Sequence, residues 1–392
     1  MSDFCVPLAN EWSFLLAACS EFPAEEKAAR ISELSRSGVR WKLLFSLAEH
    51  HGVQPILAQC LMSVGEHVPV EALDTVKKLY HANLHKALLL SRELARIVDC
   101  LSQARIEFIP YKGLALAETV YGDAALRQSG DIDLLIHPAD LRRVREAVAG
   151  LGYAPHQQLS DDEEQAYLRS GYECAFDGPM GKNLLEVQWA IQPRFYAVDV
   201  DMERLFLRSV TVTVVGAEVK TLSPEDSFLI LALHAAKHVW GKLIWLCDLA
   251  RISRSSRLDW KWIGDQAKDL GIARILLVTL ALARDLLGAS FLASALEHLP
   301  GDAAIDPLAK EIAAYIASEE SFDVESPAYF KLMMRLRERR RDRMRFVSRL
   351  AFTPGPSEWA LVRLPRSLFP LYRVVRITRL AARLVSRRAR AG

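Results

Sequence analysis

Apolar residues recur at two different spacings along the chain, and the spacing changes near residue 104. Before this point they stand three and four positions apart, for example over residues 41–48 and 71–101. This spacing places apolar side chains along one side of an amphipathic helix. From residue 104 to about 220, short apolar runs of strand length alternate with helical segments. The pattern therefore predicts a helical region followed by an α+β region.

Turn and start signals divide the chain further. The expected strands cover residues 106–110, 132–136, 173–176 and 184–189, and residues 210–215 and 218–221 are expected to form a hairpin. Pro138 begins a helix that reaches about residue 151, and Pro224 begins a mostly helical stretch. We expect an N-terminal helical region at 1–103, an α+β core at 104–222, a helical domain at 223–330 and a C-terminal tail at 331–392.

The charge distribution makes the tail distinct. The whole chain carries a net charge of +2, but residues 331–392 hold 18 basic and 3 acidic side chains, a net +15. The pattern over residues 367–390 predicts a basic amphipathic helix. Three interpretations stay open: a helix packed on the acidic body, attachment to an anionic membrane surface, or nucleic-acid binding.

Composition places the chain among soluble globular proteins. Hydrophobic residues make up 51% and charged residues 25%, and the six cysteines form no Cys-x-x-Cys pair. The N-terminus shows no signal-peptide pattern, and the apolar stretch 275–283 has about half the length needed to span a bilayer. We expect a cytoplasmic location, with the tail as the candidate contact to the inner membrane face.

Two aspartates stand at the head of the apolar run 132–136. Asp131 and Asp133 are two residues apart, so on a strand they project from the same face. Two acids at the end of a buried strand are unfavourable unless a cation lies between them. Hard divalent ions such as Mg²⁺ prefer oxygen ligands of this kind. The alternative is a solvated edge strand with two surface acids.

Basic and small residues precede this pair. Gly113 lets the backbone approach a ligand closely, the helix start that follows it offers N–H groups to an anion, and Lys112 adds a positive charge. Arg127 and Ser129 stand four and two residues before Asp131 and are suited to phosphate oxygens. Alternatively, Lys112 and Arg127 neutralise the acids as ion pairs.

A third acid, Glu186, lies within the expected strand 184–189. An acid in an apolar strand needs a partner. If this strand neighbours the one that carries Asp131 and Asp133, Glu186 forms the third arm of a metal site. The alternative is a glutamate on an exposed face.

The order Lys-Gly, helix, Arg-x-Ser-x-Asp-Ile-Asp and a later strand acid resembles the polymerase-β-like nucleotidyltransferase superfamily. More narrowly, the chain resembles a bacterial family of uncharacterised nucleotidyltransferases. That likeness extends to the helical segment 41–61, to the stretch 222–250 and to Pro354, Glu358, Trp359, Leu364 and Pro365. It implies a small mixed β-sheet core at 104–222, flanked by N- and C-terminal helical regions.

The resemblance implies an enzyme that moves a nucleoside monophosphate from a nucleoside triphosphate, such as ATP, to an acceptor hydroxyl or phosphate and releases pyrophosphate. Two Mg²⁺ ions would be held by Asp131, Asp133 and Glu186, with Glu186 as a candidate base. The triphosphate would be bound by Lys112, Gly113, Arg127 and Ser129. The acceptor stays open among small molecules, peptides, proteins and RNA.

Two positions depart from the family pattern. Leu114 follows Gly113, where the superfamily usually has Ser or a second Gly that touches the triphosphate. Gln188 stands two residues after Glu186, where this group often has His. The first departure weakens the expected phosphate contact, and the second changes the surroundings of the metal site.

His234, Lys237 and His238 share one helix face. His-x-x-x-His is a zinc-ligand spacing, but Ala235 replaces the Glu of a zinc-protease helix. The other interpretations are a patch that faces the nucleotide or acceptor, and a structural patch that pairs with Asp248. Asp248 is therefore an auxiliary candidate.

Other function classes receive less support. The chain has no Gly-x-x-x-x-Gly-Lys-Ser/Thr loop, and Ser129 has no neighbouring His that would activate it as a nucleophile. Two alternatives to an enzyme remain. One is a catalytically silent nucleotide-binding or scaffold module, and the other is a peripheral membrane or nucleic-acid-binding protein led by the basic tail.

Overall fold

A five-stranded mixed sheet lies among helices in the computed structural model, which describes residues 9–64, 68–181, 183–299, 301–318 and 326–391, without the side chains of 9, 292, 293 and 383–391. The strands follow the order β1-β2-β5-β4-β3, with β2 and β5 parallel and the other pairs antiparallel. Their bounds are β1 (Phe108–Pro110), β2 (Asp131–Ile136), β3 (Ala154–Pro155), β4 (Glu173–Asp177) and β5 (Leu184–Gln188). The expected α+β fold with a small mixed sheet is confirmed.

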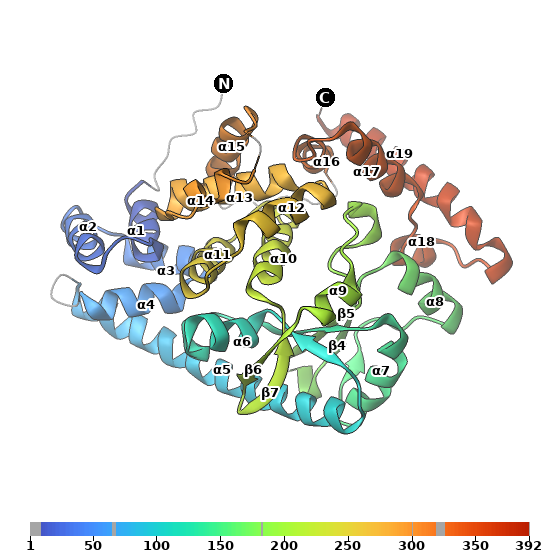
Figure 1. Cartoon of the computed structure of the whole chain (residues 1–392), viewed down its shortest axis with the longest axis horizontal. Coiled ribbons are helices and arrows are strands. Elements are labelled where there is room, and N and C mark those ends of the chain that lie inside the picture. Colours follow the sequence, from blue (N-terminus) through green and yellow to red (C-terminus); the bar gives the residue numbers. More distant parts are fainter. Residues whose placement is uncertain (1–8, 65–67, 182, 300, 319–325, 392) are drawn as a thin grey trace.

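Different helices pack against the two faces of the sheet. On one face, Ile132 and Leu134 of β2 and Leu185 of β5 pack against α5 (Val70–Gln103) and α7 (Leu141–Ala149). Leu135 points to the other face, toward α9 (Met202–Leu207) and α10 (Pro224–Lys237). This alternation follows from the two-residue period of a strand. In Figure 1, α5 runs beneath the sheet and α10 stands above it.

A separate hairpin joins β6 (Val210–Val214) to β7 (Ala217–Thr221), as the sequence predicts. Its turn lies one residue earlier than expected, at Val215 and Gly216. Both residues have positive φ, at 50° and 79°, which is the conformation of a two-residue turn that matches the strand twist.

The helices before and after the sheet share one large core. Phe14 of α1, Leu57 of α4, Phe228 of α10 and Leu280 of α13 belong to the same buried cluster. These helices are α1 (Ala9–Cys19), α2 (Ala24–Arg36), α3 (Trp41–His50), α4 (Gln54–Ser63), α11 (Leu243–Ser255), α12 (Trp260–Leu270), α13 (Ala273–Leu287), α14 (Leu292–Leu296) and α15 (Ile305–Ala317). The start of α10 is fixed by Ser223, whose side chain accepts a hydrogen bond from the Asp226 amide at 3.2 Å.

The C-terminal tail contacts the body through arginine–carboxylate pairs. It comprises α16 (Pro327–Arg335), α17 (Arg340–Phe352), α18 (Pro356–Leu361) and α19 (Tyr372–Ala391). Arg349 donates to Asp199 at 2.9 Å, Arg345 also pairs with Asp199, and Arg366 lies 3.2 Å from Asp162 of α8 (Asp161–Ser170). Part of the positive charge of the tail is therefore used within the chain.

No helix within the described residues has both the length and the apolar character needed to cross a membrane.

One buried histidine makes the stability of the fold depend on pH. His51 is 0% exposed and packs against Trp12 with ring centroids 5.2 Å apart. Neither of its ring nitrogens has a hydrogen-bond partner among the described residues. Burial, with His50 and Lys242 adding to it, lowers the pKa of His51 to about 3. The folded chain therefore excludes a proton that the unfolded chain binds.

The free energy of unfolding should consequently fall as the pH drops below about 6.5, the ordinary pKa of histidine. At pH 5 the loss from this one group is about 2 kcal/mol. Urea denaturation at pH 7 and pH 5 should show a decline smaller by this amount in His51→Phe than in the natural chain. The exposed His81→Gln variant serves as the control and should keep the full decline. An unchanged decline in His51→Phe would contradict the prediction.

Candidate active site

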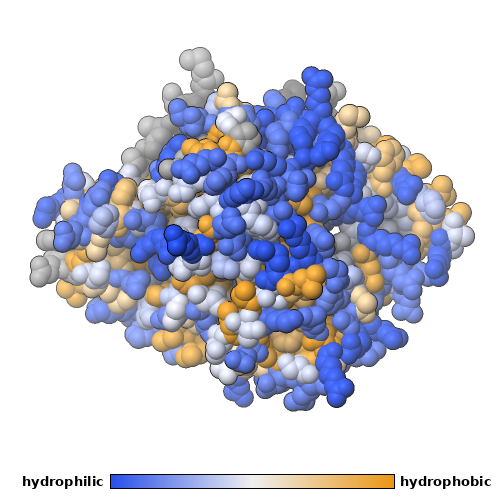
Figure 2. Space-filling view, in the orientation of Figure 1, coloured by the Kyte–Doolittle hydropathy of each residue, from blue (hydrophilic) through white to orange (hydrophobic). Residues whose placement is uncertain are grey.

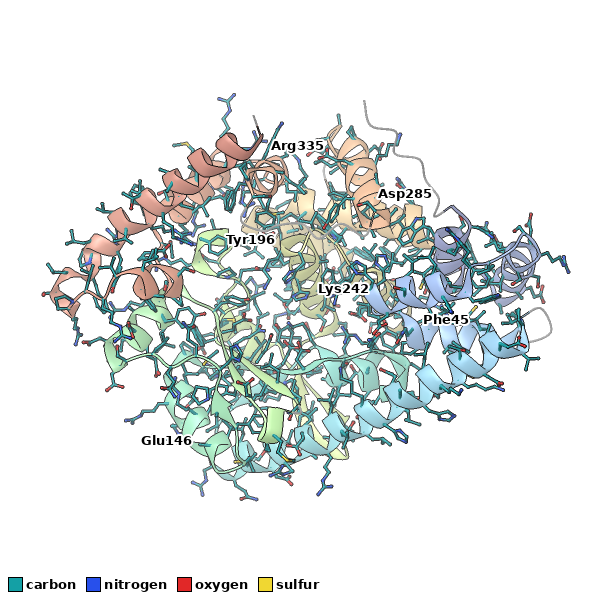
Figure 3. The ribbon with its side chains drawn as sticks, turned by 180° about the vertical axis from the view of Figure 1, so that it is seen from behind. Phe45, Glu146, Tyr196, Lys242, Asp285 and Arg335 are labelled. Atoms are coloured by element: carbon teal, nitrogen blue, oxygen red, sulfur yellow. The ribbon has the colours of Figure 1, made fainter. Side chains whose placement is uncertain are left out.

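A cavity of about 430 Å³ lies where the end of the sheet meets α10 and α11, and we call it the carboxylate cavity. Lys242, one of its lining residues, lies near the centre of the molecule in Figure 3. The cavity brings together nearly all residues singled out from the sequence: Lys112, Gly113, Arg127, Ser129, Asp131, Asp133, Glu186, His234, Lys237 and His238. Asp248 is absent from the lining.

Strand register places the carboxylates. Asp133 of β2 pairs with Glu186 of the parallel strand β5, so the two side chains project from neighbouring positions on one face. Asp131 precedes Asp133 by two residues and shares that face. Glu173, at the start of β4, pairs with Gln188 of β5 and adds a fourth carboxylate to the cavity wall.

Gln188 connects these carboxylates. Its Nε2 lies 3.3 Å from a carboxylate oxygen of each of Asp133, Glu173 and Glu186. Its Oε1 accepts a hydrogen bond from the Tyr111 hydroxyl at 2.5 Å, which turns the amide nitrogen toward the acids. An amide has only two N–H donors for three acceptors. Gln188 therefore orients the carboxylates without neutralising them.

Lys112 places a positive charge directly against the carboxylate of Asp133. Its Nζ lies 2.7 Å from Asp133 Oδ1, and both side chains are almost fully buried. Burial disfavours the charged ammonium, but Asp133 outweighs this effect and raises the pKa of Lys112. Of the two alternatives for Lys112, the structure has the ion pair.

Burial and mutual repulsion act on the carboxylates of the cavity. Burial, followed by repulsion from Asp133, raises the pKa of Asp131. Burial, together with Asp133 and Glu173, raises the pKa of Glu186 to about 8. These shifts are the response expected of several carboxylates that share a site of low dielectric constant.

The donor set fits a hard divalent cation. Its oxygens come from carboxylates on two adjacent strands, the type of ligand that Mg²⁺ takes. In the described part of the chain no three His, Cys, Asp or Glu side chains already stand in metal-binding geometry. The ammonium of Lys112 lies against Asp133, where a cation would be held. Asp131, Asp133 and Glu186 are the residues that could hold Mg²⁺, and in this structure Lys112 is paired with Asp133.

Arg127 is held by Asp248 rather than by the aspartates of β2. Its Nε and Nη2 donate to the two carboxylate oxygens of Asp248, each at 2.9 Å. Asp248 also accepts from the Tyr121 hydroxyl at 2.7 Å. Arg127 Nη1 donates to Ser129 Oγ at 3.3 Å, which orders the loop before β2. The auxiliary candidate Asp248 therefore positions Arg127 from outside the cavity.

Gly113 and Leu114 have different roles. A Cβ on Gly113 would lie 3.2 Å from the Asp131 carbonyl oxygen, and φ there is +53°, so the chain needs glycine at this close approach. Gly113 begins α6 (Gly113–Leu116), a single turn that continues as a π-helix over Ala117–Tyr121. Leu114 is buried in the core beneath the sheet. Leu114, which departs from the family pattern, therefore packs in the core and does not line the carboxylate cavity.

The polar patch at the end of α10 lies on the opposite wall. His234 and His238 have ring centroids 4.9 Å apart, and Trp245 lies 5.2 Å from His234. Burial, with Lys112 adding to it, lowers the pKa of His234 well below its usual value. Lys237 donates to the Tyr172 hydroxyl at 3.1 Å, and burial lowers its pKa. The patch does not pair with Asp248.

Sequence reasoning missed several lining residues. Glu173 begins a strand that the sequence predicts, but only the β4–β5 register brings it beside Gln188. Glu49 comes from α3 and Lys86 from α5, and Lys242 is the extended residue just before α11. The only signal for Glu49 was its place in the helical segment 41–61 of the family pattern.

A family model described as an uncharacterised nucleotidyltransferase matches residues 37–288. The chain belongs to this family. The matched range contains every residue singled out for the site and excludes the basic tail. No curated protein matches the chain.

Two solved structures resemble it distantly. The antibiotic-resistance factor ANT(2'')-Ia is 17% identical, with a TM-score of 0.32 over 54% of this chain and 96% of its own. An antigenic nucleotidyltransferase-like protein from Paracoccidioides brasiliensis is 15% identical, with a TM-score of 0.33 over 56% of this chain and 95% of its own. A likeness at these TM-scores carries no argument about function.

Removing the carboxylate that holds Arg127 should destabilise the fold strongly. Asp248→Ala leaves a buried guanidinium without its partner, which is expected to cost about 3–5 kcal/mol of unfolding free energy. Glu26→Ala, which breaks the exposed pair with Arg30 on α2, should cost less than about 1 kcal/mol. Urea denaturation of both variants checks this, and equal losses would contradict it.

Proposed function

We propose that the chain is a Mg²⁺-dependent nucleotidyltransferase that moves a nucleoside monophosphate from a nucleoside triphosphate to an acceptor. The observation that carries the proposal is the carboxylate cavity. Asp131, Asp133 and Glu186 project from the same face of two paired strands into one cavity, in a chain whose family is one of nucleotidyltransferases. Four carboxylates crowded at a strand end are best explained by a cation that binds there.

In this proposal, the residues of the carboxylate cavity have separate roles in binding the metal and the phosphates. Asp131, Asp133 and Glu186 would hold Mg²⁺, which when bound neutralises phosphate charge and activates a hydroxyl. Lys112, released from Asp133, pairs with phosphate oxygens, and Arg127 and Ser129 present donors from the loop before β2. Gly113 lets the triphosphate approach the backbone. Gln188 keeps the carboxylates aimed into the cavity through its contacts with all three neighbours.

Transfer exchanges one bond to the α-phosphorus for another. The acceptor oxygen forms a bond to the α-phosphorus, the bond between the α-phosphorus and its bridging oxygen breaks, and pyrophosphate leaves. Glu186 takes the proton of the acceptor hydroxyl.

The test is transfer of label from an α-labelled nucleoside triphosphate to the small-molecule fraction of a cell extract, with and without MgCl₂. Asp131→Asn, Asp133→Asn and Glu186→Gln should each lower the rate on the order of 100-fold or more. Glu146→Gln, a change on the outer edge of the molecule in Figure 3, should leave the rate unchanged.

Calorimetry of Mg²⁺ and nucleotide binding separates the alternatives. Binding without any Mg²⁺-dependent label or pyrophosphate would favour a silent nucleotide-binding module. Binding that is unchanged in Asp131→Asn and Asp133→Asn would remove the proposed site altogether.

One observation favours a second candidate function for the tail, attachment to an anionic membrane surface. Nine large hydrophobic side chains between Met344 and Ile377 are exposed, among many arginines. Figure 2 shows hydrophobic surface at this end of the molecule. Exposed apolar groups beside cationic ones are typical of helices that lie on membranes.

Vesicle flotation of the full chain tests this candidate. Vesicles with anionic lipid should bind the natural chain, and the double variant Val374→Glu/Ile377→Glu should bind at least about ten times more weakly. The matched control, Leu88→Glu/Leu89→Glu, changes two exposed leucines on α5 and should bind normally. Equal binding by all three, or none to anionic vesicles, would rule the candidate out.

A further inference from the structure

A second cavity of about 350 Å³ adjoins the carboxylate cavity, and we call it the aromatic cavity. Five aromatic side chains form its walls: Tyr167, Tyr172, Phe195, Tyr329 and Phe330. Its volume lies in the range of sites that hold small molecules. Aromatic walls favour a ligand with a flat or apolar body, because rings pack against rings over a large area.

The two cavities share a boundary. Tyr172, Lys237 and His238 line both of them. Lys237 Nζ lies 4.6 Å from the centre of the Tyr172 ring and donates to its hydroxyl, so the two side chains form one partition. Glu173, the residue after Tyr172, lies on the carboxylate side. A ligand in the aromatic cavity therefore has one end beside the carboxylates.

The far end of the aromatic cavity is positively charged. Arg376 and Arg379 of α19 line it, and their side chains are only 10% and 14% exposed. They share a single carboxylate, Glu358, which lies 3.3 Å from Arg376 Nη1 and 2.5 Å from Arg379 Nε. Two guanidinium groups against one carboxylate leave a net positive charge in a poorly solvated place.

The position of Arg379 leaves donors for a ligand. Arg376 donates a hydrogen bond from Nε to the Leu350 carbonyl at 2.6 Å and another from Nη1 to Glu358. Glu358 Oε2 also accepts from the Gly355 amide at 2.8 Å, and Oε1 lies against Arg379 Nε as an ion pair. Among the described residues, the two terminal nitrogens of Arg379 have no hydrogen-bond partner. A guanidinium with two unused donors is suited to a carboxylate or phosphate group.

We propose that the aromatic cavity binds the acceptor, and that the acceptor is a small molecule with an aromatic body, an anionic group at one end and a hydroxyl at the other. This inference rests on the proposed function. The anionic group pairs with Arg379, the body packs against the aromatic walls that include Phe330, and the hydroxyl reaches the partition at Tyr172. There its oxygen bonds to the α-phosphorus, its proton passes to Glu186 and pyrophosphate leaves.

The test uses two fluorescent probes on the full chain, without nucleotide or metal. One is 8-anilinonaphthalene-1-sulfonate, which is aromatic and anionic, and the other is N-phenyl-1-naphthylamine, which has the same rings and no charge. Arg379→Gln should weaken binding of the anionic probe about tenfold and leave the neutral one unchanged, while Arg379→Lys should retain most of the preference. Phe330→Ala should weaken both probes.

Competition on the natural chain gives a second measurement that needs no variant. 4-Hydroxyphenylacetate or 4-hydroxybenzylphosphonate should displace the anionic probe, and the stronger of the two identifies the anionic group as carboxylate or phosphate. The neutral 4-ethylphenol should compete at least tenfold more weakly. Equal competition by all three, or a probe affinity that is the same in Arg379→Gln, would overturn the proposal. Displacement by ATP alone would also overturn it, because the cavity would then hold the nucleotide.

The outcome can be separated from that of the proposed function. Probe binding needs neither Mg²⁺ nor transfer, so it is measurable in a chain that releases no pyrophosphate. If Mg²⁺-dependent transfer is found while the affinities of the probes are unchanged in Arg379→Gln and Phe330→Ala, only the assignment of the aromatic cavity to the acceptor fails.

Discussion

The crowding of four carboxylates at the end of the sheet is the constraint that shapes the rest of the site. Asp131, Asp133 and Glu186 meet because two strands run parallel in one register, and Glu173 joins them from the next strand. Burial, followed by repulsion from neighbouring carboxylates, raises the pKa of Asp131 and Glu186, and such crowding weakens the fold. The chain offsets the repulsion with Lys112, and a Mg²⁺ ion bound there would offset it further.

This constraint ties the sheet to the helical body. The sheet has its own apolar core with α5 and α7, while the helices before and after it share another. The carboxylate cavity lies between them, with acids on the side of the sheet and His234, Lys237 and Lys242 on the side of the helices. The pair between Arg127 and Asp248 joins the loop before β2 to α11. The site therefore exists only when both parts are packed together.

The sequence predicts the parts of this site that follow from local periodicity. The strands carrying Asp131 and Glu186 were expected from their apolar runs, and the shared face of Asp131 and Asp133 follows from the two-residue period. Pairing across long sequence separations could not be predicted. Arg127 and Asp248 are 121 residues apart. No local sequence pattern indicates that Asp248 pairs with Arg127 rather than with His234 or His238. Gln188 shows the same limit, since its three acceptors and Tyr111 come from four segments.

The basic tail shows that part of its charge is used in contacts within the chain. Its net charge of +15 leaves three interpretations open, and packing on the acidic body is one of them. In the structure, Arg345 and Arg349 share Asp199, and Arg376 and Arg379 share Glu358, a carboxylate of the tail itself. Arg376 and Arg379, which are almost buried around one carboxylate, cannot follow a phosphate backbone, because binding of that kind needs solvated cations along a surface. These two arginines line the aromatic cavity and are placed to receive a single anionic group there, which argues that this part of the tail contributes to the site.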